Sequence, residues 1–233
     1  MRTYRALSAL LTYPTADLQA AVPAIRMALA EGLLPPAHVA AIEPMLNDLA
    51  TRDIYDLQER FVLLFDRSRT LSLNLFEHIH GESRDRGGAM VDLLETYRAG
   101  GFDLVGPELP DHLPVLLEFL STQPPEQARA ILADAGHIIL ALAERLKRRE
   151  SNYAPVLSAL VALAQIGISA EAEALLSEAD DDPEDLAALD AVWEEAQVTF
   201  GPDPDAGCPI SRDILAKMDM PLSPARAPHA QGS

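Results

Sequence analysis

Apolar residues recur along most of this chain at steps of three and four positions, which is the period of an α-helix. Alternating apolar and polar runs joined by turn dipeptides, which are typical of paired strands, do not occur in the sequence, so no sheet is expected. Prolines and glycines separate the periodic segments, as at Pro14, Pro35-Pro36 and Gly100-Gly101. The pattern predicts an all-α fold.

The first half of the chain carries four apolar stripes of helical period. They run from Leu7 to Leu11, from Leu18 to Leu29, from Val39 to Leu49 and from Leu57 to Phe65. Thr15 stands where its side chain can cap the second helix. The stretch 66–69 is a polar break, and Gly81 and the Gly87-Gly88 pair interrupt the helical pattern. The next helix is therefore expected only from Ala89 to Arg98.

The second half of the chain is expected to continue with helices, the first of them on the apolar run from Leu113 to Leu120. The longest amphipathic helix is expected from Pro125 to about Arg149. A helix with Pro155 in its first turn follows closely enough to form an antiparallel hairpin with it. Asp182 is placed to cap a further helix that carries Trp193.

Residues 1–200 are therefore expected to form a single compact helical domain. Residues 201–233 are rich in proline, glycine and alanine, and they bury too little apolar surface to offset the entropy lost on ordering. We expect them to form a flexible, largely disordered tail.

The net charge of the chain limits the kinds of molecule that it can bind. The 233 residues include 18 lysines and arginines against 36 aspartates and glutamates, which gives a formal net charge of −18. Such a chain repels the phosphates of nucleic acids and anionic membranes and attracts basic partners. The single cysteine, Cys208, excludes an intramolecular disulfide and a cysteine-based metal cluster. No signal-peptide core and no uncharged apolar run of ~20 residues is present, so we expect a cytoplasmic protein, neither secreted nor embedded in a membrane.

Catalytic motifs do not occur: the sequence has no nucleophile elbow, phosphate-binding loop, dinucleotide fingerprint or zinc-protease motif. An enzyme is therefore not expected. The one tempting arrangement is Glu77 with His80, which have the spacing found in carboxylate di-iron bundles. That site needs a second copy, and Asp134 with His137 is the nearest substitute. A metal-binding oxidase is accordingly an alternative, and the favoured interpretation is that these residues cap and cross-link a break between helices.

A second polar motif surrounds Pro110. Glu108, Asp111 and His112 suggest acid–base chemistry, but no nucleophile accompanies them. The structural interpretation is favoured: Pro110 starts a helix, Asp111 lies near the positive end of that helix, and His112 reaches back to a loop carboxylate. The motif is then a rigid hinge between two layers of helices.

Three longer segments together resemble one known family. They are Glu59–Arg67 (ERFVLLFDR), Ser72–Gly87 (SLNLFEHIHGESRDRG) and Glu108–Leu113 (ELPDHL). These segments are similar to the molybdenum cofactor assembly chaperones of nitrate reductase, the NarJ or delta-subunit family within the TorD-like superfamily. The likeness extends from Tyr13-Pro14 to Trp193–Gly201 and leaves only the last ~30 residues outside it.

The resemblance implies a function. The protein would bind the apo form of the catalytic alpha subunit of a respiratory nitrate reductase, including its N-terminal segment, which is a remnant of a twin-arginine leader. It would enable insertion of the molybdenum-bis(guanine dinucleotide) cofactor before the subunit docks at the membrane. It would hold no cofactor permanently and would not be a subunit of the mature enzyme. The resemblance also implies that the hinge motif lies beside the peptide-binding surface.

The residues themselves offer apolar and acidic groups to a cationic, amphipathic helix. The predicted client-binding residues are Phe61, Leu64, Phe65, Asp66, Leu75, Phe76, Glu108, Pro110, Asp111 and His112. The predicted structural or client network around them is Glu77, His78, His80, Glu82, Arg84, Asp85 and Arg86. Two alternatives stay open: the phenylalanines and leucines are ordinary core, or the protein is a general helical adaptor for another basic protein.

Overall fold

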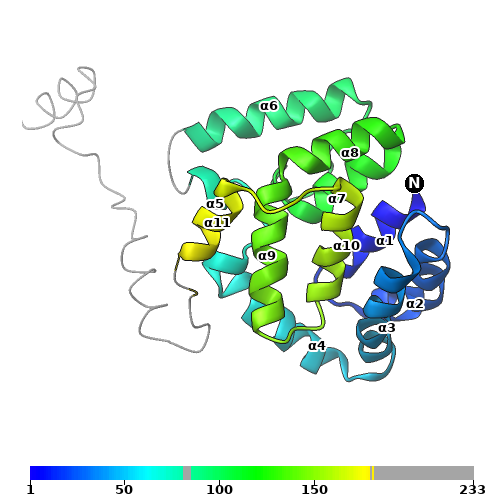
Figure 1. The fold of residues 1–233 in the computed structure, drawn as a ribbon. Helices are drawn as coiled ribbons and strands as arrows, with labels where there is room; N and C mark the ends of the chain where they lie inside the picture. Colours follow the sequence, from blue (N-terminus) through cyan, green and yellow to red (C-terminus); the bar gives the residue numbers. More distant parts are fainter. Residues whose placement is uncertain (81–84, 179, 181–233) are drawn as a thin grey trace, which may run out of the picture. The chain divides into compact units, whose positions relative to one another are not determined.

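Helices account for the regular secondary structure of the residues that the computed structural model describes, which are 1–80, 85–178 and 180 (Figure 1). The α-helices are α1 (Arg2–Leu10), α2 (Ala16–Leu29), α3 (Pro36–Thr51), α4 (Ile54–Phe61), α5 (Glu77–His80), α6 (Asp85–Ala99), α7 (Leu113–Thr122), α8 (Pro125–Asp134), α9 (Gly136–Arg148), α10 (Ala154–Ala164) and α11 (Ala170–Ser177). A π-helical turn, η1 (Val62–Asp66), continues α4, and a 3-10 turn, η2 (Arg69–Leu71), follows it. The all-α prediction is confirmed. The helix expected after Asp182 and the tail predicted at 201–233 lie outside the described residues.

The helices begin where local signals place them. The Thr15 side chain accepts a hydrogen bond from the N–H of Leu18 at 3.1 Å, so it caps α2 as predicted. The Asp53 side chain accepts from the N–H of Tyr55 at 2.8 Å and caps α4 in the same way. Proline in the first turn of α3, α7, α8 and α10 leaves no intrahelical hydrogen bond unmade, because the first N–H groups of a helix have no partner within it.

The core forms where two pairs of helices meet. Helix α9 packs along α10, and Figure 1 shows the two lying side by side as the predicted hairpin. Helix α1 packs on α7, whose face toward the core is almost wholly apolar. Leu7, Leu117 and Leu160 have no exposed surface. Burial of such side chains contributes about 1.5–3 kcal/mol each, so these contacts dominate the stability of the fold.

The single helix expected from Pro125 to about Arg149 is two helices, α8 and α9, which meet at Ala135. A Cβ placed on Gly136, the first residue of α9, would lie 2.7 Å from Ile166. The absence of a side chain therefore lets the start of α9 approach Ile166 closely. Both helices face the same core, so the apolar period crosses the break without revealing it.

The Gly87-Gly88 pair does not interrupt a helix, because α6 starts at Asp85 and runs through both glycines. Each glycine costs about 1 kcal/mol relative to alanine, which a helix of 15 residues tolerates. The predicted end of this helix is confirmed. Gly101 has a φ of +74°, a left-handed conformation that glycine adopts without strain, and the chain leaves the helix there.

Replacing glycine by alanine is expected to have opposite effects on stability at two positions of this region, Gly100 and Gly88. Gly100→Ala is expected to lower the free energy of unfolding by about 1–3 kcal/mol, because the new Cβ would lie 2.5 Å from the buried ring of Phe119. Gly88→Ala meets open space inside α6 and is expected to raise it by about 0.5–1 kcal/mol. Urea unfolding followed by circular dichroism measures both; a shift of the same sign in the two variants would contradict this packing.

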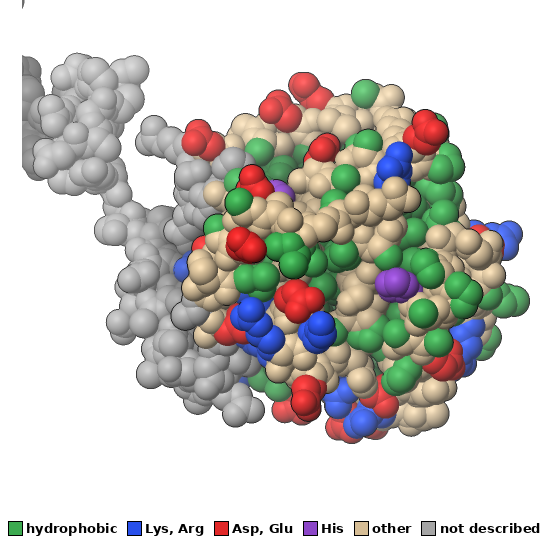
Figure 2. Space-filling model, in the orientation of Figure 1, with side chains coloured by type: hydrophobic (Ala, Val, Ile, Leu, Met, Phe, Trp, Pro, Cys, Tyr) green, Lys and Arg blue, Asp and Glu red, His purple; other side chains and the backbone are tan. Residues whose placement is uncertain are grey.

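Charged side chains are spread over the surface of the described chain. On the face shown in Figure 2, acidic side chains are scattered from the edge to the middle, and apolar side chains lie between them and toward one side. None of the helices in residues 1–80 and 85–178 is long and apolar enough to cross a membrane.

Candidate functional site

A polar cleft of about 360 Å³ lies between α1, α7, the turn η1 and the loop that precedes α7. We call it the acidic cleft. Its lining residues are Ser8, Thr12, Tyr13, Phe61, Asp66, Glu108, His112, Pro114, Val115 and Glu118. This set contains three carboxylates and no lysine or arginine, so the lining favours a positively charged group.

The wall formed by α4 and η1 is aromatic and ends in a carboxylate. Phe61 and Phe65 are buried, with ring centroids 4.9 Å apart, and Tyr153 packs against both. Tyr13 meets Phe61 edge to face at 5.8 Å and is 47% exposed, so its ring is accessible from the cleft. The π-helical turn closes with the N–H of Arg67 donating to the Val62 carbonyl at 3.0 Å. It ends at Asp66, whose side chain lines the cleft.

The opposite wall is carried by residues 108–113, which we call the strap. The strap pairs with the segment 73–76: the N–H of Leu75 donates to the Asp111 carbonyl at 3.1 Å, and the N–H of Leu113 donates to the Leu73 carbonyl at 2.8 Å. These two hydrogen bonds form an antiparallel bridge between Asn74 and His112. Pro110 and Asp111 lie in a turn, which the N–H of His112 closes by donating to the Leu109 carbonyl at 3.1 Å. The prediction that Pro110 starts a helix is therefore wrong, because α7 begins at Leu113.

Two strap side chains line the cleft: His112, which is a member of the bridge, and Glu108, which is exposed. His112 Nδ1 lies 3.2 Å from the Asn74 side-chain oxygen, which orients the ring. Burial lowers the pKa of His112, although the charges of Glu108, Asp111 and Asp66 act in the opposite direction. Burial raises the pKa of Asp66; the charge of Glu108 adds to this rise and that of His112 opposes it. The cleft therefore brings like charges together at some cost, which a bound cation would offset.

Behind the cleft lies a buried polar network centred on Asp111, which has no exposed surface. Its Oδ2 accepts from the N–H of Phe76 at 3.0 Å and lies 3.8 Å from the Arg86 guanidinium. Burial raises the pKa of Asp111, against the influence of the Phe76 hydrogen bond and of Arg86.

Arg86 also pairs with Glu77 at 3.2 Å. Burial acts to raise the pKa of Glu77, but hydrogen bonds from Ser72 and Asn74 and the Arg86 charge hold it below its usual value.

The arrangement of Glu77 and His78 does not suit a metal. His78 Nε2 is 2.8 Å from the Ser72 carbonyl, and Glu77 is engaged by Arg86 and Asn74. No group of three or more histidine, cysteine, aspartate or glutamate side chains in the described part of the chain is placed to hold a metal ion. The side chain of His80 and the predicted network residues Glu82 and Arg84 lie outside the described residues. Where the network is described, it joins the segment before α6 to the start of that helix through Glu77 and Arg86.

The structure divides the ten predicted client-binding residues into three groups. Phe61, Asp66, Glu108 and His112 line the acidic cleft together. Leu64 and Phe76 are half-buried outside its lining. Phe65, Leu75, Pro110 and Asp111 are buried and lie behind it.

Sequence reasoning missed Tyr13 and Glu118, which also line the cleft. Glu118 carried a usable signal, since it is the exposed acid within the otherwise buried run Leu113–Ser121. Tyr13 lies in the loop between α1 and α2, so the helical pattern of apolar residues gave no signal for it.

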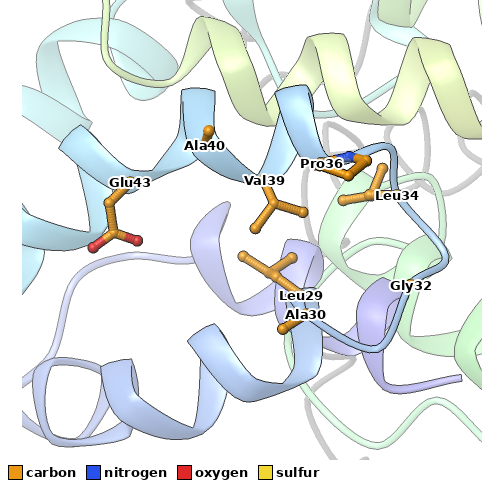
Figure 3. Close-up of a pocket in the computed structure, with 8 residues that line it drawn as sticks. All are labelled: Leu29, Ala30, Gly32, Leu34, Pro36, Val39, Ala40 and Glu43. Atoms are coloured by element: carbon orange, nitrogen blue, oxygen red, sulfur yellow. The ribbon is translucent and has the colours of Figure 1, made fainter.

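A larger, apolar groove of about 530 Å³ lies between the end of α2 and the start of α3 (Figure 3). Leu29, Leu34 and Val39 extend into it from the two helices and their connection. The charged residue of its lining, Glu43, is paired with Arg26 at 2.7 Å. The groove therefore offers apolar packing without an uncommitted charge, which makes it a poorer match than the acidic cleft for a cationic segment.

Comparison with known proteins identifies relatives. The family model described as nitrate reductase delta subunit matches residues 16–159. The nitrate reductase molybdenum cofactor assembly chaperone NarJ of Escherichia coli K12 is 46% identical over 204 residues, which cover 86% of each chain. The probable chaperone NarJ of Bacillus subtilis is 32% identical over 175 residues, covering 73% of this chain and 93% of its own. These relatives carry the names of assembly chaperones and not of enzymes.

The fold also has a solved counterpart. The crystal structure of a proposed redox enzyme maturation protein from Archaeoglobus fulgidus matches with a TM-score of 0.53. At 23% identity, over 71% of this chain and 94% of that one, the match shows a shared fold. The relatives and the family model show more: the chain belongs to the nitrate reductase delta subunit family.

Proposed function

We propose that this protein is the assembly chaperone of a respiratory nitrate reductase. It binds the apo catalytic alpha subunit and enables insertion of the molybdenum-bis(guanine dinucleotide) cofactor before that subunit docks at the membrane. The observation that carries the proposal is the 46% identity with Escherichia coli NarJ over 86% of both chains. The cofactor is cargo for the client, and the chaperone itself has no catalytic step.

The acidic cleft is the proposed site for the N-terminal segment of the client. An arginine of that segment would lie over the exposed Tyr13 ring and between the carboxylates of Asp66, Glu108 and Glu118, which combines cation–π attraction with charge-assisted hydrogen bonds. An apolar neighbour of that arginine would pack on Phe61. Two features support this choice over the apolar groove: the acids of the cleft form no ion pair with a described residue, and its lining includes four of the residues predicted from the sequence.

The buried members of the predicted site have supporting roles in this proposal. Phe65 and Leu75 form the packing behind the cleft wall. Pro110 and Asp111 hold the strap from its inner side, and Asp111 does so through its backbone and its carboxylate. Leu64 and Phe76, which are half-buried, are proposed to extend the apolar contact at the margin.

Co-purification tests the function directly. An affinity-tagged copy of the full chain, expressed in cells that respire nitrate, is expected to recover the large catalytic subunit in a cofactor-free form, as identified by mass spectrometry and molybdenum analysis. The matched control is a tagged copy in which Asp66 and Glu108 are replaced by their amides, which should recover much less. Recovery of unrelated basic proteins in place of the nitrate reductase subunit would support the general adaptor and refute the proposal.

Salt dependence provides a separate prediction about how the encounter occurs. The net charge of −18 should steer a basic client segment toward the chain. Between about 0.1 M and about 1 M salt the Debye length falls from about 10 Å to about 3 Å, so the association rate constant should fall about tenfold or more. Stopped-flow fluorescence with a labelled peptide of the client N-terminus measures this rate. An association rate that does not change with salt would remove electrostatic steering from the proposal.

A further inference from the structure

Helix α6 has few contacts with the core for its length. Tyr97 is its one buried residue, and Leu93 is half-buried against the core. Val91, near the middle, is 55% exposed. Figure 1 shows α6 along one edge of the bundle, and α5 is the helix that it contacts most. Such a helix depends on specific attachments more than on burial.

The first attachment lies at the start of the helix. Arg86 pairs with Glu77 at 3.2 Å and lies 3.8 Å from Oδ2 of Asp111. The second oxygen of Asp111, Oδ1, is buried and has no hydrogen-bond partner among the described residues. Since Asp111 is fully buried, the positive charge of Arg86 offsets part of the cost of burying this carboxylate.

The second attachment lies at the other end. The hydroxyl of Tyr97 donates to the Pro110 carbonyl at 2.6 Å. Its ring packs between Phe102 and Phe119, with centroids at 5.5 and 4.7 Å. The hydroxyl and the ring therefore fix the end of α6 to the strap and to α7.

Both attachments end on adjacent residues of the strap, Pro110 and Asp111. Two nearby strap residues have side chains that line the acidic cleft: Glu108, two positions before Pro110, and His112, next to Asp111. The inner side of this short segment thus holds α6 while its outer side forms a wall of the cleft.

We propose that α6 positions the client-binding site: Arg86 and Tyr97 hold the strap in the geometry that presents Glu108 and His112 to the cleft. The inference rests on the proposed function of the cleft. Arg86 and Tyr97 are positioning residues, since neither belongs to the cleft lining. Thermodynamic linkage gives a reciprocal consequence: if docking of α6 strengthens peptide binding, bound peptide strengthens the docking of α6 by the same factor.

Peptide affinity tests the first half of the inference. Arg86→Gln and Tyr97→Phe are each expected to weaken binding of a fluorescent peptide of the client N-terminus by about fivefold or more, while Arg86→Lys recovers part of the affinity. Arg98→Gln makes the same charge change on an exposed side chain of α6, and Tyr55→Phe removes a hydroxyl from a side chain that is 76% exposed. Both control variants should bind like the wild type.

Hydrogen exchange tests the second half. Bound peptide is expected to slow exchange of the α6 backbone amides in the wild type and in Arg98→Gln, and to slow it much less in Arg86→Gln. This readout separates positioning from a general loss of stability, which would speed exchange throughout the chain regardless of peptide. If Arg86→Gln does not fold, Tyr97→Phe answers the same question.

The outcomes separate the two proposals. A wild-type chain that fails to bind the peptide overturns the proposed function of the cleft. A wild-type chain that binds, with Arg86→Gln and Tyr97→Phe equal to their controls and no effect of peptide on α6 exchange, overturns the positioning role alone.

Discussion

Replacing Arg145 by alanine is expected to lower the free energy of unfolding by about 3 kcal/mol, toward the lower end of the values known for disrupted buried ion pairs. Arg145 is 1% exposed, in the last turn of α9. Its guanidinium donates to the Thr70 carbonyl at 2.9 Å and to the Leu175 carbonyl. It therefore connects η2 and α11 to α9 through one part-buried and one buried hydrogen bond.

The acidic partners of Arg145 contribute less than those carbonyls. Glu178, at 3.5 Å, is 62% exposed, so solvent screens the pair and can solvate the carboxylate when the arginine is removed. Asp180, at 3.1 Å, is less exposed than Glu178, so solvent screens its pair with Arg145 less. The main loss is the two charge-assisted hydrogen bonds to those carbonyl groups, at about 1.5–3 kcal/mol each, together with the space vacated by the side chain. The Leu175 carbonyl keeps the N–H of Glu178 as a donor at 3.4 Å.

Urea unfolding of the full chain measures this cost. Arg148→Ala, an exposed arginine in the same helix, should change the free energy of unfolding by no more than about 0.5 kcal/mol. Arg145→Met keeps much of the apolar stem and removes the charge, so it should recover the packing part of the loss and leave the hydrogen-bonding part. A wild-type midpoint for Arg145→Ala would contradict a stabilising role for these two hydrogen bonds.

The helical period predicted much of the fold because most helices bury one stripe against a common core. The stripes of α2, α3, α7 and α10 contain the residues that the structure buries, such as Val22, Ile42, Leu117 and Leu160. The prediction failed where a helix boundary or a helix depends on something other than a periodic apolar stripe. A tight approach at Gly136 starts a new helix, and no property of the preceding stripe indicates it. Helix α11 buries only Ala172 and Leu175, too few apolar residues to form a recognisable stripe.

The candidate site was predictable in part for a different reason. The three family segments carry Phe61, Asp66, Glu108 and His112, and the fold brings those residues together. The burial of Asp111 could not be read from its motif, because an aspartate beside a proline and a histidine is ordinarily exposed. Its environment depends on Phe76 and Arg86, which are distant in sequence and meet it only through the bridge between the strap and the segment 73–76.

The double substitution Asp66→Asn with Glu108→Gln is expected to weaken binding of the client N-terminal peptide by about 100-fold and to abolish most maturation of the client enzyme. A hydrogen bond to a charged group contributes about 1.5–3 kcal/mol, and two such losses that are only partly additive give a factor of this size. The fold should persist. Burial and the Glu108 charge raise the pKa of Asp66, so its charged form opposes folding above the pKa of the unfolded chain, and neutral asparagine removes that cost.

The matched control is Asp17→Asn with Glu126→Gln, which makes the same change in net charge at two exposed acids outside the cleft. Isothermal titration calorimetry gives the affinities of both variants, and nitrate reductase activity and molybdenum content in cells lacking their own chaperone give the maturation. If net charge alone attracts the client, the two variants lose affinity equally. If the client arginine lies between Asp66 and Glu108, only the cleft variant loses affinity, and its unfolding midpoint is equal to or higher than that of the wild type. Equal losses in both variants would place the client segment elsewhere on the acidic surface.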